Sequence, residues 1–261
     1  MSVTNMNTVE NIMETEVAIR TADGTADGFL YTPSDGRTPG GAGWPGAVHL
    51  VDIGGIRESH RRMSKRLASK GYVVLLPNVF YRVGKAPFFD WPINADDERT
   101  MRSLNELRES LPPAAVERDG AAYIDFLAKQ ESVSGGAMGA VGYCFTGAMA
   151  LRFAAVRPDK IAAAASFHGG RLYTDDPASP HTRLPRIKAR LYFGHAMEDR
   201  SMPNEAISKF ESALASWGGK YESETYRALH GWTVPDSPAY NKPQAERAFE
   251  KLTELFGAAL K

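Results

Sequence analysis

The stretch that decides the fold is Ala137-Met-Gly-Ala-Val-Gly-Tyr-Cys144-Phe-Thr-Gly-Ala-Met-Ala-Leu151. It begins as an apolar run with strand character, turns through Gly142 and Cys144, and continues as an Ala/Met/Leu run with helix character. This layout is typical of a nucleophile elbow, where the nucleophile lies between small residues at a strained strand-to-helix turn. The helix directs its N-terminus at the nucleophile, so its N–H groups stabilise a thiolate and an oxyanion. The segment therefore predicts a reactive Cys144.

The elbow pattern has one departure, because its second glycine position holds Thr146 and Gly147 follows one residue later. The alternative interpretation is a buried structural cysteine beside ordinary turn glycines, since free cysteine is often buried. The chain has one cysteine, which excludes an internal disulfide and a cysteine-based zinc site. The position of Cys144 at the apex of the turn favours reactivity.

Outward from the elbow, the chain alternates strand-like and helix-like segments. Strands are predicted at 17–20, 29–31, 47–53, 72–76, 137–141, 161–167, 189–193 and 221–226, and helices at 59–70, 94–109, 113–130, 145–156, 204–217 and 243–260. Uniformly apolar strands separated by helices indicate a mostly parallel central sheet with helices on both faces. We therefore predict a single α/β domain over residues 1–261, with residues 1–14 flexible.

Composition narrows the classes of function. The 261 residues include 31 Lys plus Arg and 31 Asp plus Glu, so the formal net charge is 0. This balance provides no general attraction for nucleic acid or anionic lipid. The first fifteen residues lack a basic region and an apolar core, so we expect no secretory signal, no membrane association and a cytoplasmic location. No nucleotide-binding or metal-binding motif occurs, and we expect no cofactor and no metal.

A cysteine nucleophile needs a base, and the base needs an acid that orients it. In folds of this class the acid and then the histidine follow the nucleophile along the chain. Asp199 comes after the strand at 189–193 and His230 after the last strand, and Glu198 is the alternative acid. Active sites of open α/β sheets lie at the carboxyl ends of strands. We therefore expect Cys144, Asp199 and His230 to converge there.

These segments resemble the dienelactone hydrolase family of the α/β-hydrolase superfamily. The resemblance is carried by Gly142-Tyr-Cys144-Phe, Asp199-Arg-Ser-Met-Pro203, His230-Gly-Trp, Val51-Asp-Ile-Gly-Gly-Ile-Arg and Lys70-Gly-Tyr-Val-Val-Leu-Leu-Pro. It implies an α/β-hydrolase fold and hydrolysis of an ester or enol-lactone through a thioester. It also implies Cys144 as nucleophile, His230 as base and acid, Asp199 as its orienter, and the amides of Ile53 and Phe145 as oxyanion donors.

Three positions depart from the family pattern. Asp52 stands where the family has a glutamate near the thiol, and Val234 stands where one of two carboxylate-binding arginines is expected. The other arginine corresponds to Arg99 or Arg102, and the register leaves both open. Aromatic residues of the segment 78–93 and the histidine turn suggest an apolar pocket for a larger or less charged acyl group. Core packing is the alternative for these aromatics; the candidates are Tyr81, Phe88, Trp91 and Trp232.

Two other classes of protein compete with a cysteine hydrolase. One is a non-catalytic binder of small molecules that retains the hydrolase fold, although a binder has no need of a complete Cys–Asp–His order. The other is an enzyme similar to the class I amidotransferases, which would need its histidine and acid in a different context. We therefore predict a cysteine-dependent ester or lactone hydrolase whose partner is a small-molecule substrate. The sequence does not indicate an oligomeric state.

Overall fold

The computed structural model describes residues 11–34, 43–91, 93 and 97–260. Its centre is an eight-stranded sheet in the order β1-β2-β4-β3-β5-β6-β7-β8. The strands are β1 (Ile12–Thr21), β2 (Gly24–Pro33), β3 (Gly46–His49), β4 (Val73–Pro77), β5 (Met138–Tyr143), β6 (Ile161–Phe167), β7 (Arg190–Glu198) and β8 (Tyr221–Leu229). The hairpin of β1 and β2 is antiparallel and joins β4 antiparallel, whereas all pairs from β4 to β8 are parallel. The predicted mostly parallel sheet is thus confirmed.

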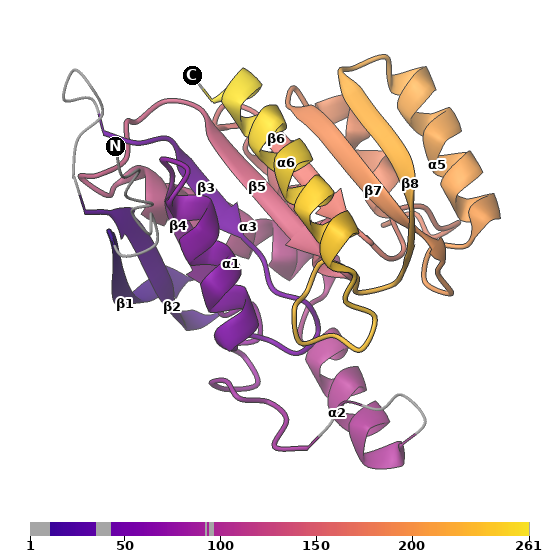
Figure 1. Ribbon diagram of the computed structural model, residues 1–261, viewed down its shortest axis with the longest axis horizontal. Coiled ribbons are helices and arrows are strands. Elements are labelled where there is room, and N and C mark those ends of the chain that lie inside the picture. The colour runs from indigo at the N-terminus through magenta and orange to yellow at the C-terminus, as the bar shows by residue number, and fades with distance from the viewer. Residues whose placement is uncertain (1–10, 35–42, 92, 94–96, 261) are drawn as a thin grey trace, which may run out of the picture.

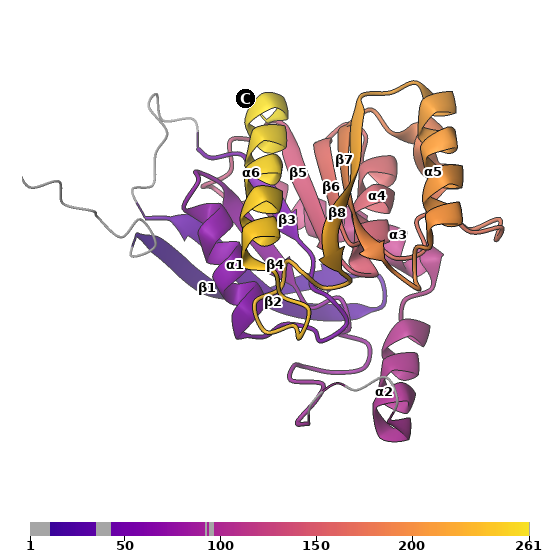
Figure 2. The ribbon, with the colours of Figure 1, turned by 45° about the vertical axis from the view of Figure 1, so that its right-hand side comes forward.

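Helices cover both faces of the sheet (Figure 1). Helices α1 (Glu58–Ala68) and α6 (Lys242–Ala259) lie on one face, and α3 (Pro113–Ala128) and α4 (Thr146–Val156) lie on the other. Helix α5 (Asn204–Trp217) packs on β7 and on the 3₁₀ helix η1 (Pro180–Arg186), which also contacts α4. Helix α2 (Glu98–Glu109) stands apart from both layers (Figure 2). No helix of the described ranges is long and apolar enough to cross a membrane.

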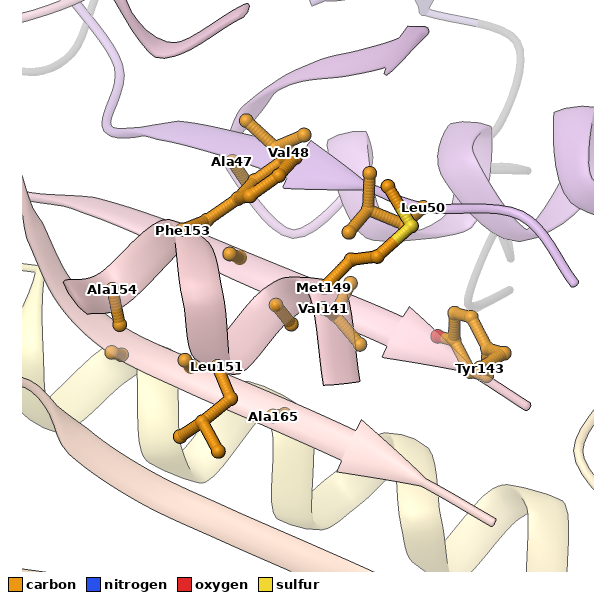
Figure 3. Close-up of a cluster of buried hydrophobic side chains, with 14 of the residues drawn as sticks. Ala47, Val48, Leu50, Val141, Tyr143, Met149, Leu151, Phe153, Ala154 and Ala165 are labelled. Carbon is orange, nitrogen blue, oxygen red and sulfur yellow. The ribbon is translucent and has the colours of Figure 1, made fainter. Parts of the chain in front are cut away.

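The core between α4 and the sheet explains why this part of the sequence is so apolar. Every residue of β3, β4 and β5 is buried, and α4 is buried along most of its length. Figure 3 shows Met149 and Phe153 of α4 extending toward Leu50 and Val48. The burial of these side chains fixes the helix at the end of β5, and with it the position of the turn that carries Cys144.

Several element boundaries differ from the sequence-based expectation. Strand β3 ends at His49, because residues 50–53 form the loop that passes the carboxyl edge of the sheet. Strand β7 continues to Glu198, because residues 194–198 pair with β8. The proline-rich loop contains η1. Residues 1–10 of the segment expected to be flexible lie outside the described residues, whereas residues 12–14 begin β1.

Candidate active site

The turn after β5 places Cys144 in a left-handed conformation, with φ of 58°. That conformation is costly for a residue with a side chain and persists only where the surroundings enforce it. A Cβ at Gly142 would lie 2.1 Å from the Thr146 carbonyl oxygen, and a Cβ at Gly147 would lie 2.2 Å from a β6 hydroxyl. Gly147 is therefore the second small residue of the elbow. Thr146 is buried, and its hydroxyl bonds the amide and the carbonyl of Tyr143 at 2.9 Å each.

The chain segments after β7 and β8 bring Asp199 and His230 to the same edge of the sheet. His230 Nδ1 lies 2.6 Å from Asp199 Oδ2. The other carboxylate oxygen of Asp199 accepts hydrogen bonds from the Ser201 amide (2.8 Å) and hydroxyl (2.6 Å). Cys144, Asp199 and His230 line one cavity, so the structure brings these three residues together.

The electrostatics of this group favour a protonated histidine. Burial works to lower the pKa of His230, but the hydrogen bonds and charges of Asp199 and Cys144 raise it to about 10. Burial works to raise the pKa of Asp199, but His230 and Ser201 hold it below its ordinary value. The arrangement therefore favours an imidazolium beside the Asp199 carboxylate at neutral pH.

Two backbone amides, those of Phe145 and Ile53, are the expected oxyanion donors. Phe145 precedes α4 with φ of −61°, and no side chain caps that helix. Ile53 lies in the loop after β3, the strand next to β5 in the sheet. Neither amide donates to an acceptor within the part of the chain that the structure describes. An oxyanion donor must be unpaired before the substrate binds, so the role of these two amides as oxyanion donors stays a prediction.

The cavity has a volume of about 1180 Å³. One part of its wall is apolar and comes from Phe145 and from residues of α3, α4 and the segment before them: Leu111, Pro113, Val116, Ala148 and Met149. Another part includes Arg108, Arg171 and Arg200, none of which has an acidic partner among the described residues. None of these arginines is among the residues that the sequence predicts for the site. Arg171 follows β6 and Arg200 follows Asp199, so the rule that sites lie at carboxyl ends of strands would have found both.

The expected carboxylate-binding residues lie elsewhere. Asp52 does not line the cavity, because its carboxylate accepts hydrogen bonds from Arg57 (2.8 Å) and from a loop amide. Arg99 is exposed on α2, where it packs 3.5 Å from the Trp91 ring and pairs with Asp90. Arg102 is exposed on the same helix. None of these residues lines the cavity, and the expectation that Asp52 and either Arg99 or Arg102 contact the substrate stays a prediction.

The four predicted pocket aromatics are also absent from the cavity wall. Trp232 is fully buried and packs on a tyrosine of β8. The Tyr81 hydroxyl bonds Thr21 and a buried aspartate of α3. Phe88 packs edge-on against Phe80 at 5.3 Å, and Trp91 donates to the hydroxyl of a buried threonine in α2. The alternative of core and loop packing describes all four, because each side chain finds its partners inside the protein.

Nothing in the described residues suggests a metal centre. No group of three or more His, Cys, Asp or Glu side chains is arranged to hold an ion within 11–34, 43–91, 93 and 97–260. His49 and His60 are buried and bonded to each other at 3.1 Å, and the second nitrogen of His60 accepts from the Asp52 amide. This pair supports the loop after β3.

The order of the strands and the layers of helices are those of the α/β-hydrolase fold. Comparison with known sequences assigns the family: residues 27–260 match the dienelactone hydrolase family, and the chain belongs to it. It is thus a hydrolase of the ester or lactone class. A carboxymethylenebutenolidase of Rhodococcus opacus is 26% identical over 223 residues, which cover 80% of this chain and 79% of the relative.

Solved structures share the fold. A dienelactone hydrolase-like promiscuous phosphotriesterase from metagenomic libraries superposes with a TM-score of 0.77 and 21% identity, covering 96% of this chain and all of that one. A dienelactone hydrolase from Anabaena variabilis superposes with a TM-score of 0.67 and 18% identity, with the same coverage. At these identities the likeness concerns the fold alone.

Proposed function

We propose that the protein hydrolyses a carboxylic ester or an enol-lactone through a thioester acyl-enzyme. Cys144 is the nucleophile, His230 the general base and acid, and Asp199 the residue that orients His230. The observation that carries this proposal is the convergence of Cys144, His230 and Asp199 on the wall of one cavity, with His230 Nδ1 2.6 Å from Asp199 Oδ2. This is the arrangement by which an adjacent base and its orienting acid activate a thiol.

The cycle follows from the positions of these groups. His230 holds the thiol proton, the sulfur attacks the carbonyl carbon, and the new oxyanion accepts hydrogen bonds from the amides of Ile53 and Phe145. The C–O bond then breaks, and His230 gives its proton to the leaving oxygen. In a lactone that oxygen stays tethered to the acyl group. Water attacks the thioester with His230 as base, which releases the acid and restores the thiol.

The cavity wall indicates the kind of substrate. Its apolar part beside Phe145 suits an acyl chain or ring, and Arg108, Arg171 and Arg200 offer donors to an anionic group. A volume of about 1180 Å³ is larger than a small lactone needs. These features support an ester or lactone with an apolar portion and an anionic group, bound by arginines other than those that the family resemblance implies.

The decisive experiment is hydrolysis of p-nitrophenyl acetate by the wild-type protein and by Cys144→Ala. The wild type should turn over the ester, lose activity with iodoacetamide and gain one carboxamidomethyl group at Cys144 by mass spectrometry. Cys144→Ala should lose at least about 10³-fold in kcat/KM, because no other group can form the thioester. Full activity of Cys144→Ala would remove the proposed mechanism. Tight binding of esters without turnover would favour the non-catalytic binder.

A further inference from the structure

The turn after β6 contacts the backbone of Cys144 on both sides. The Cys144 N–H donates to the Phe167 carbonyl oxygen at 3.1 Å and to His168 Nδ1 at 3.0 Å. The Gly170 N–H donates to the Cys144 carbonyl oxygen at 3.2 Å. The position of the proposed nucleophile therefore depends on this neighbouring strand end as well as on its own elbow.

The same turn reaches the segments that carry the acid and the histidine. The Arg171 N–H donates to the Ser201 carbonyl oxygen at 2.8 Å, two residues after Asp199 in the chain. His168 Nε2 lies 2.7 Å from the hydroxyl of Thr233, three residues after His230. A single short turn thus connects all three segments of the proposed triad.

The hydrogen bonds of His168 determine its tautomer. Nδ1 accepts from the Cys144 N–H, so the proton of the neutral imidazole is on Nε2, which donates to Thr233 Oγ1. Burial holds the pKa of His168 well below its usual range, and the nearby positive charge of His230 acts in the same direction. The imidazole therefore stays neutral and keeps both hydrogen bonds at neutral pH.

Backbone strain marks the same residue. Within the described ranges, three residues other than glycine have positive φ: Cys144 (58°), His168 (40°) and Arg171 (53°). All three lie at this edge of the sheet. Strain of this kind costs free energy and persists where the surrounding structure over-determines it, often at functional sites. The His168 ring also meets the His230 ring edge-on, with centroids 5.0 Å apart.

We propose that His168 is a positioning residue that fixes the separation of the Cys144 backbone and the turn of His230, a role that rests on the proposed triad. Its imidazole spans the two segments with one hydrogen bond at each nitrogen. The distance between nucleophile and base matters because small misplacements of reacting groups cost large factors in rate. His168 takes no proton in the cycle.

The test is a double-mutant cycle on His168 and Thr233. Thr233→Val removes only the acceptor of Nε2–H, and Thr233→Ser restores a hydroxyl. His168→Asn places an acceptor oxygen near the position of Nδ1 and tolerates the left-handed backbone, but cannot reach Thr233. Thr253→Val, on α6, is the matched control. Thermal melting of each variant checks that it folds.

We expect Thr233→Val and His168→Asn each to lower kcat about tenfold and to change KM less than twofold, because one positioning hydrogen bond is lost. The double variant should be no slower than His168→Asn, and Thr233→Ser and Thr253→Val should match the wild type. Wild-type kcat in Thr233→Val, or losses that multiply in the double variant, would overturn the proposal.

A second readout separates this inference from the proposed function. The rate of Cys144 alkylation by iodoacetamide needs no substrate, and it should fall in Thr233→Val and recover in Thr233→Ser. If the wild type cleaves no ester, the proposed function fails. The alkylation rates of the Thr233 variants still measure whether the His168–Thr233 hydrogen bond affects Cys144. If esters are cleaved and alkylation is unchanged in Thr233→Val, the inference about His168 fails alone.

Discussion

Two regions of this molecule differ in the contacts that their side chains make. The triad edge comprises the turns after β5, β6, β7 and β8, with residues at positive φ and short polar contacts such as His230 Nδ1 to Asp199 Oδ2. The aromatic segment comprises residues 79–91 with α2, where side chains pack on one another and hydroxyls find local partners. The triad edge holds the residues proposed for catalysis, whereas the side chains of the aromatic segment pack on one another.

The largest difference between the two regions should appear when Asp199 is changed. Asp199→Asn keeps the shape of the side chain but removes the charge that holds His230 in its orientation and protonation state. We expect kcat to fall about 10²- to 10⁴-fold, as for the loss of an orienting acid in a triad. Initial rates with p-nitrophenyl acetate measure the effect.

Glu198→Gln is the matched control, because Glu198 is adjacent, exposed and the alternative acid of the sequence analysis. Its kcat should stay within about threefold of the wild type, since the change leaves the hydrogen bonds of Asp199 intact. A greater loss in Glu198→Gln than in Asp199→Asn would reverse the assignment of the acid.

A second contrast concerns the free energy of unfolding, which substitutions at two glycines should change to different extents. A Cβ at Gly142 would meet the Thr146 carbonyl oxygen at 2.1 Å, whereas a Cβ at Gly136 would have its nearest neighbour at 3.8 Å. We expect Gly142→Ala to lower the free energy of unfolding by about 2–4 kcal/mol, because backbone at the elbow must move. Gly136→Ala should change it by less than about 1 kcal/mol. Urea unfolding measures both, and equal values would contradict a sterically enforced elbow.

The two regions also differ in how far the sequence predicts them. Strand ends and glycines place the backbone of a turn, so Cys144, Asp199 and His230 come to one edge whatever their side chains do. The direction of an aromatic side chain, in contrast, depends on how it packs against residues that are distant in the sequence. Trp232 lies two residues after His230, and its side chain is buried in the core. No local sequence pattern distinguishes a core position from a position on the cavity wall.

Element boundaries and the partners of charged residues are likewise predictable only where local sequence determines them. Helix α5 begins and ends where the sequence predicts, because Gly218 stops it in a left-handed conformation with φ of 72°. The sequence predicts a loop where the 3₁₀ helix η1 forms, because this segment contains two prolines. The family resemblance predicts Asp52 near the thiol, but the pairing of Asp52 with Arg57 depends on a tertiary contact that also includes Asp236.

A pH dependence of stability should arise at the triad edge. The pKa of His230 is raised from 6.5 to about 10, so its stabilisation is complete below about pH 6.5 and is lost as the pH rises through about 10. The pKa of Asp199 is lowered, so its stabilisation is present above its ordinary value and is lost as the pH falls through the lowered one. The wild type should therefore lose stability between pH 7 and 10.5.

Asp199→Asn isolates this contribution from other groups that titrate in the same range. The raised pKa of His230 depends on the Asp199 charge, so the decline in the free energy of unfolding between pH 7 and 10.5 should be shallower in the variant. Urea denaturation at several pH values measures the difference between the two proteins. Parallel curves would show that the Asp199–His230 pair does not contribute in this window.

The smallest expected effect concerns arginines from the two regions. Arg171 lines the cavity at the triad edge, whereas Arg102 is exposed on α2 and does not. With mono-p-nitrophenyl succinate, an anionic ester, Arg171→Ala should raise KM about three- to tenfold, because a solvent-accessible ion pair contributes little more than 1 kcal/mol. With neutral p-nitrophenyl acetate it should leave KM within twofold. Arg102→Ala should leave KM within twofold of the wild type for both esters. If KM for the anionic ester rises in Arg102→Ala and not in Arg171→Ala, the anion-binding site lies on α2 and the aromatic segment takes part in substrate binding.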